Sequence, residues 1–91
     1  MAVTVKLPTQ LRDAAGGATS ASVDAGTVGE ALEALYAEHG ELRGRLADAG
    51  GGLRRFVNVF VAGEDVRFGE GIDTAVTEGQ EVTILPAVAG G

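Results

Sequence analysis

Cysteine is absent from this chain of 91 residues. Its absence excludes disulfides, thiolate nucleophiles and cysteine-ligated metal centres, so any reactive sulfur has to come from another molecule. Histidine occurs once, as His39, near the end of a predicted helix. A contact with the helix dipole or a solvated position is favoured there over catalysis. A metal site needs a cluster of ligands, and the sequence pattern offers none.

Long apolar runs and positive charge are also scarce. No stretch approaches the roughly 20 apolar residues of a membrane span, and Met1–Lys6 lacks the long apolar core of a signal peptide. We therefore expect a cytoplasmic protein with no membrane partner. Seven basic residues against 13 acidic ones give a net charge of −6, which argues against a nucleic-acid partner. The charge either suits a basic protein partner or serves only solubility.

The length and composition are typical of one small globular domain. Hydrophobic residues make up 45% of the chain and charged residues 22%, a balance found in folded rather than disordered proteins. A domain of this size buries only about 60–65% of the surface that its unfolded chain exposes, so it needs a continuous core and has little room for a deep cleft. We expect residues 1–86 to form the domain and residues 87–91 a flexible C-terminal tail.

Alternating apolar residues predict a hairpin at the start of the chain. Apolar and polar residues alternate over 3–7, in the period-two pattern of a half-buried strand that ends at Pro8. Residues 13–17 break the pattern, and a second, weaker strand follows over 18–23. The two strands together predict an antiparallel pair with a long loop.

A capping box predicts the start of a helix at Thr27. The Thr27 hydroxyl can accept from the amide of Glu30, whose carboxylate reaches back over the first turn. An apolar stripe at helical spacing follows: Val28, Ala31, Leu32, Leu35 and Tyr36. Gly40 predicts the helix end, a short helical turn is expected over 41–47, and residues 48–52 form a glycine-rich loop without the lysine and hydroxyl of a phosphate loop.

The second half of the chain predicts further strands. Residues 56–62 are β-branched and aromatic, as in a buried strand, and residues 81–85 form the last strand after a turn over 77–80. A short turn of helix is expected over 73–76. The element order is β-β-α-β-(β)-β, which predicts an α+β domain in which one amphipathic helix covers one face of a mixed sheet.

This order, followed by the C-terminal segment Leu85-Pro86-Ala87-Val88-Ala89-Gly90-Gly91, resembles the ubiquitin-like β-grasp sulfur carriers of the MoaD/ThiS family. The resemblance covers the whole chain and implies a four- to five-stranded mixed sheet packed on one amphipathic helix. Within the family, residues 55–61, 64–68 and 82–91 look most like the cysteine-synthesis carriers of actinobacteria. Gln10-Leu11-Arg12 is shared more loosely with the small subunit of molybdopterin synthase.

The resemblance implies that the chain is not an enzyme but is acted on at its C-terminus. In the family, an E1-like adenylating and sulfurtransferase partner uses ATP to convert the terminal carboxylate, here that of Gly91, to an acyl-adenylate, and sulfide then yields a thiocarboxylate. Gly90, Ala89, Val88 and Ala87 would thread into the partner's active site. Glycine suits this task because it has no Cβ and leaves the carbonyl unhindered. No cofactor is expected on the carrier itself.

The resemblance leaves open which process uses the C-terminus of this chain. In cysteine synthesis, the partners implied by the resemblance are a pyridoxal-phosphate cysteine synthase, which holds the pyridoxal phosphate, and a metallopeptidase that releases cysteine. In molybdenum-cofactor synthesis, the partner is the large subunit of molybdopterin synthase. A third alternative is a protein modifier joined through Gly91 to target lysines, and Lys6 is then the single internal lysine acceptor.

A docking face for these partners is expected on the domain. Pro8, Phe60 and Leu85 form an exposed apolar patch if the valines of segment 57–61 face the helix. Alternatively, Phe60 belongs to the core and the valines face outward. Three arginines either flank this patch or are simply solvated: Arg54, Arg55 and Arg67.

Overall fold

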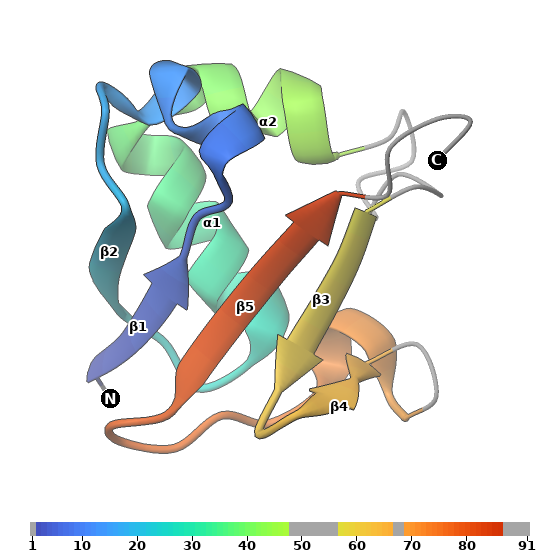
Figure 1. The fold of residues 1–91 in the computed structure, drawn as a ribbon. Coiled ribbons are helices and arrows are strands. Elements are labelled where there is room, and N and C mark those ends of the chain that lie inside the picture. Colours follow the sequence, from blue (N-terminus) through green and yellow to red (C-terminus); the bar gives the residue numbers. More distant parts are fainter. Residues whose placement is uncertain (1, 48–56, 67–68, 87–91) are drawn as a thin grey trace.

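The structure is a computed structural model that describes residues 2–47, 57–66 and 69–86. Five strands form one mixed sheet in the order β2-β1-β5-β3-β4. The strands are β1 (Ala2–Lys6), β2 (Ser20–Asp24), β3 (Val57–Val61), β4 (Glu64–Asp65) and β5 (Glu81–Pro86). β1 and β5 are parallel, and the other neighbouring pairs are antiparallel. Figure 1 shows helix α1 (Val28–Glu38) crossing one face of this sheet, as expected for a β-grasp domain.

The predicted N-terminal hairpin is confirmed, with its second strand displaced by two residues at the start. β2 begins at Ser20 because residues 12–18 fold into tight turns, in which the Gly17 amide donates to the Arg12 carbonyl at 2.6 Å. Gly16 and Gly17 both have positive φ, which glycine adopts without steric cost. Two 3₁₀ turns precede β2, η1 (Thr9–Leu11) and η2 (Asp13–Ala15).

The predicted capping box starts α1, with one difference. The Thr27 hydroxyl accepts from the Glu30 amide at 3.1 Å, as expected. The Glu30 carboxylate, however, accepts from the amide of Gly26 at 2.7 Å, one residue before the cap. All five residues of the predicted apolar stripe are buried: Val28, Ala31, Leu32, Leu35 and Tyr36.

The second helix, α2 (Gly40–Leu46), begins at the glycine that was expected to end the first one. His39 links the two helices, donating its amide to the Leu35 carbonyl and accepting at its own carbonyl from Leu42, both at 2.9 Å. The prediction of a helix end at this point is therefore correct. The short helical turn expected over 41–47 is also confirmed by α2, whose Leu42 and Leu46 are buried and add to the core.

The chain after β3 follows a different path from the one predicted. A 3₁₀ turn, η4, covers Gly71–Asp73 rather than residues 73–76. The prediction was wrong because residues 74–76 are extended: the Thr74 carbonyl accepts from the Val28 amide at 2.9 Å, and the Val76 amide donates to the Gly26 carbonyl at 3.0 Å. The predicted turn over 77–80 is confirmed by a hydrogen bond from the Gln80 amide to the Thr77 carbonyl.

Candidate functional site

The C-terminal strand occupies the centre of the sheet. β5 lies between β1 and β3, and it ends at Pro86, which is paired with Val57 at the start of β3. The predicted reactive segment, Ala87, Val88, Ala89, Gly90 and Gly91, lies outside the described residues. Its chemistry therefore stays a prediction, but the point from which the segment continues is defined by β5.

The two faces of β5 and β3 differ sharply in burial. Val82 and Ile84 are fully buried toward the helices, whereas Leu85 is 46% exposed. In β3, Val57 and Val59 are buried and therefore face the helices. Successive side chains of a strand point to opposite faces, so Asn58 and the half-buried Phe60 lie on the outer face. Of the two orientations that the sequence left open, the structure has the valines inward.

The register places Phe60 and Leu85 close together on this outer face. Phe60 pairs with Thr83, and Leu85 pairs with Asn58, so the two apolar side chains are diagonal neighbours across β3 and β5. Diagonal neighbours lie about 7–8 Å apart, within reach of an aromatic ring. The two residues therefore form one apolar area on the outer face.

Pro8 lies at the same end of the sheet. It is half-buried and comes two residues after Lys6, which pairs with Thr83 on the parallel strand β5. Leu85 likewise comes two residues after Thr83, so both leave the paired segment in the same direction. Pro8 and Leu85 therefore lie toward the same end of the sheet, and a docking patch made of these residues and Phe60 stays a prediction. Arg54, Arg55 and Arg67 lie outside the described residues.

One row of residues crosses the whole outer face at the level of Phe60. Pairing partners along the five strands are, in order, Ser20, Lys6, Thr83, Phe60 and Asp65. The sequence pattern did not predict this row, because it depends on the relative registers of strands far apart in the chain. We refer to it below as the Lys6–Phe60 row.

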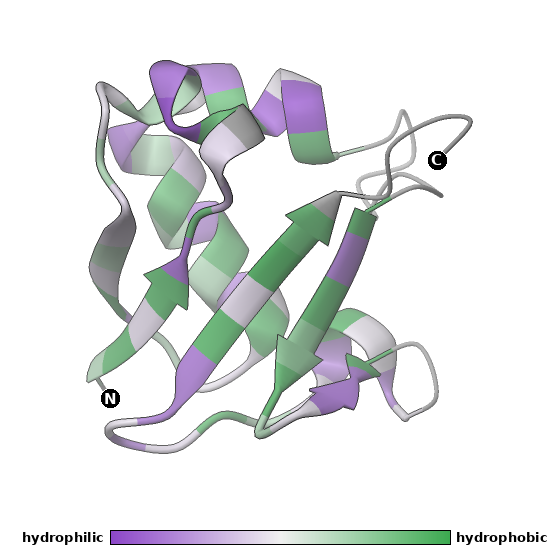
Figure 2. Ribbon diagram, in the orientation of Figure 1, coloured by the Kyte–Doolittle hydropathy of each residue, from purple (hydrophilic) through white to green (hydrophobic). Residues whose placement is uncertain are grey.

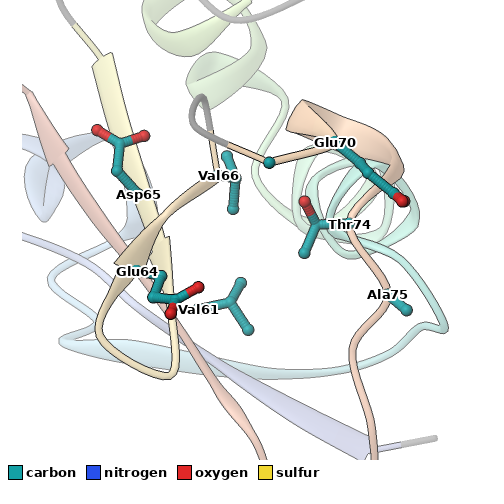
Figure 3. A pocket seen from close by; sticks show the side chains of 8 residues that line it. Val61, Glu64, Asp65, Val66, Glu70, Thr74 and Ala75 are labelled. Carbon is teal, nitrogen blue, oxygen red and sulfur yellow. The ribbon is translucent and has the colours of Figure 1, made fainter.

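A hollow of about 770 Å³ lies at the other end of β3. Figure 3 shows it between the β3–β4 hairpin and the segment around η4, with Val61, Val66 and Thr74 among its lining residues. The Thr74 hydroxyl oxygen is buried there without a hydrogen-bond partner. Because Val61 pairs with Val82 near the start of β5, the hollow is remote from Pro86. It was not predicted from the sequence.

Within residues 2–47, 57–66 and 69–86, no group of three histidine, cysteine, aspartate or glutamate side chains is placed to hold a metal ion. The helices in the same part of the chain include none that is long and apolar enough to cross a membrane. The feature that stands out is the apolar area of Phe60 and Leu85 on the outer sheet face, toward the end where β5 leads into the C-terminal segment.

Comparison with known proteins agrees with this architecture. The model of the ThiS family matches residues 5–91. The sulfur carrier protein CysO of Mycobacterium tuberculosis is 48% identical over 93 residues, with full coverage of both chains. The chain therefore belongs to the ThiS family of small ubiquitin-like proteins, and it is similar over its full length to a sulfur carrier.

Solved structures give the same result. The crystal structure of the Amycolatopsis orientalis BexX/CysO complex matches with a TM-score of 0.90 and 44% identity, covering 98% of this chain and 99% of the other. The crystal structure of small archaeal modifier protein 1 from Haloferax volcanii matches with a TM-score of 0.86 and 32% identity over all of both chains. The fold is thus shared by carriers and by protein modifiers.

Proposed function

We propose that this protein is a sulfur carrier that works through a thiocarboxylate at Gly91, most directly for cysteine biosynthesis. The observation that carries the proposal is the 48% identity to CysO over the whole of both chains. The protein is then a substrate of its partners and not itself an enzyme. ATP and sulfide are used by the activating partner, and pyridoxal phosphate belongs to the synthase that receives the sulfur.

The chemistry proceeds in two displacements, the first at the α-phosphorus of ATP and the second at the carboxyl carbon of Gly91. A Gly91 carboxylate oxygen attacks the α-phosphorus of ATP, and pyrophosphate leaves. A sulfur nucleophile then attacks the carbonyl of the acyl-adenylate, and AMP leaves with the oxygen. Activation is necessary because a free α-carboxylate is an anion at neutral pH and a poor electrophile. Gly90 and Gly91 suit a narrow active site because neither has a Cβ.

The domain contributes the surface that holds the partner. Leu85 and Phe60 offer apolar contact area on the outer face, and Pro8 extends it at the end where the chain continues toward Gly91. Leu85 is exposed and the other two are half-buried, and apolar surface grouped in this way is typical of protein interfaces. An E1-like enzyme, the cysteine synthase and a cysteine-releasing metallopeptidase would use this face in turn.

Mass spectrometry tests the proposal directly. The protein is incubated with an E1-like activating enzyme, ATP and a sulfide source, and the product is digested. We expect a mass gain equal to one sulfur replacing one oxygen, confined to the C-terminal peptide. Sulfur found on an internal residue, or no gain under conditions that convert a known carrier, would refute the mechanism. Capture of a cysteine synthase rather than the large subunit of molybdopterin synthase in a pull-down would identify the pathway.

Protein modification is a second candidate function. Small archaeal modifier protein 3 of Haloferax volcanii is 41% identical over 68 residues, covering 75% of this chain and 73% of the other. Joined through Gly91, this chain would modify target lysines, and its single lysine, Lys6, allows only one internal site for chain growth. Heavier covalent species detected by an antibody to the carrier, absent for a variant lacking Gly91, would support this function.

A further inference from the structure

The outer sheet face is divided by charge. On the side of the Lys6–Phe60 row where β5 ends, the face carries Leu85 and the half-buried Asn58. On the other side, the exposed residue Glu81 begins β5, at the strand position paired with Thr4. Figure 2 shows that β5 is hydrophilic at its start and more hydrophobic toward its end, with the residues of both faces coloured. The acidic and apolar halves therefore lie at opposite ends of one strand.

Lys6 is the cation at the boundary between these halves. Its side chain is exposed, and it is the single lysine of a chain whose net charge is −6. Among the residues that the structure describes, Lys6 forms no ion pair, whereas Arg43 and Arg45 are both paired with carboxylates. Thr83 separates Lys6 from Phe60 along the row. The ammonium group is thus placed beside the apolar area and is available to another molecule.

We propose that Lys6 sets the orientation of docking by meeting a carboxylate of the partner protein, which receives Leu85 and Phe60 in an apolar site beside it. This inference rests on the function proposed above, since the partner is the enzyme that activates the C-terminus. Turning the docked domain by half a turn about the normal to the sheet at Thr83 would exchange Glu81 with Leu85 and Phe60 with Lys6. The Glu81 carboxylate would then enter the apolar site without a partner, which disfavours this wrong orientation.

The orientation matters because of the direction of β5. Its start carries Glu81 and its end leads toward Gly91, so only one orientation directs the C-terminal segment at the active site of the partner. The acidic half of the face also disfavours a phosphate-rich surface in place of a protein. The partner surface that fits is therefore an apolar depression with a carboxylate on one side.

The first experiment compares variants of equal net charge. Lys6→Gln and Ala37→Glu each make the chain one unit more negative, but Ala37 is exposed on α1, away from the outer sheet face. We expect Lys6→Gln to lower kcat/KM for thiocarboxylate formation by about fivefold or more, with Ala37→Glu and Lys6→Arg within about twofold of the native protein. Equal values for Lys6→Gln and Ala37→Glu would overturn the inference. Melting temperatures establish that all variants are folded.

The second experiment reverses the charge division without changing the net charge. In the double variant Lys6→Glu/Glu81→Lys, the positive and negative groups exchange positions on the face. We expect a loss of about tenfold or more in kcat/KM, although the total charge stays the same. Native conversion by the double variant would refute the role of Lys6. If the native chain itself gains no sulfur, the proposed function fails instead, so the two failures are distinguishable.

Discussion

The guanidinium carbon of Arg43 lies 4.9 Å from the centre of the Tyr36 ring, which joins α2 to α1 through a cation–π contact. The same guanidinium donates to the Glu33 carboxylate at 2.8 Å. Burial, followed by the Glu33 charge, raises the pKa of Tyr36 to about 12, and Arg43 opposes this by lowering it. The ring in this contact between the helices therefore belongs to a tyrosine that stays protonated well above neutral pH.

The alkaline stability of the protein should follow from this raised pKa. The folded state keeps the Tyr36 proton up to about pH 12, whereas the unfolded chain releases it near the ordinary tyrosine pKa of 10.0. The stability that Tyr36 contributes is thus fully present below the pKa of the unfolded chain. This contribution is lost as the pH rises through the pKa of the folded protein. Urea unfolding over this range should show the fall, and Tyr36→Phe should reduce it. Because Tyr36 is the single tyrosine, tyrosinate absorbance reports its pKa directly, and titration near the ordinary tyrosine pKa in the folded protein would contradict the prediction.

Replacing two leucines by alanine should change the free energy of unfolding by very different amounts. Leu35 is fully buried between α1 and the sheet, whereas Leu85 is 46% exposed. Leu35→Ala should lower the free energy of unfolding by about 2–5 kcal/mol, because it removes buried methyl groups and leaves a cavity. Leu85→Ala, the control, should cost less than about 1 kcal/mol. Denaturant unfolding measures both, and similar losses would show that the two faces are wrongly assigned.

The β3–β4 hairpin contains a residue with an unfavourable backbone conformation. Ala62 has φ of 54° and Gly63 has φ of 84°, as in a two-residue turn that favours Asn-Gly. Ala62→Asn should therefore raise stability by about 0.5–1 kcal/mol, and Gly63→Ala should lower it by about 1–2 kcal/mol. Thermal unfolding tests the pair. A loss of stability in Ala62→Asn would mean that the turn conformation differs in solution.

Changes at the C-terminus should separate function from stability. Deleting Gly91, or adding one residue after it, should abolish sulfur transfer, because the reacting carboxylate is lost or displaced. The melting temperature should stay nearly the same, since terminal residues contribute little burial. Sulfur transfer by the extended protein, with the added residue still present in its mass spectrum, would contradict the proposed role of Gly91.

Much of the fold could be predicted because its signals are local. The Thr27 cap and the apolar stripe after it define α1 within a few residues, and the alternation in segment 3–7 defines β1. The position of η4 could not be predicted, since it depends on hydrogen bonds between residues 74–76 and the start of α1. No local pattern contains that information.

The outer face shows the same limit of sequence reasoning. Phe60 lies between Val59 and Val61 in the sequence, so the residue pattern does not decide which face of the sheet its side chain is on. The pairing of β3 with β5 decides it. The charge division depends on the same registers, because Lys6 and Glu81 are far apart in the chain. Residues could be nominated from the sequence, but their arrangement follows from the topology.

The central place of β5 has a mechanical consequence. When a partner pulls on the C-terminal segment, the load enters the one strand that is hydrogen-bonded to both β1 and β3. Displacing β5 along its axis would shear the bonds on both sides together rather than opening them one at a time. The domain can therefore bear tension on its reactive end while the α1-covered core stays intact.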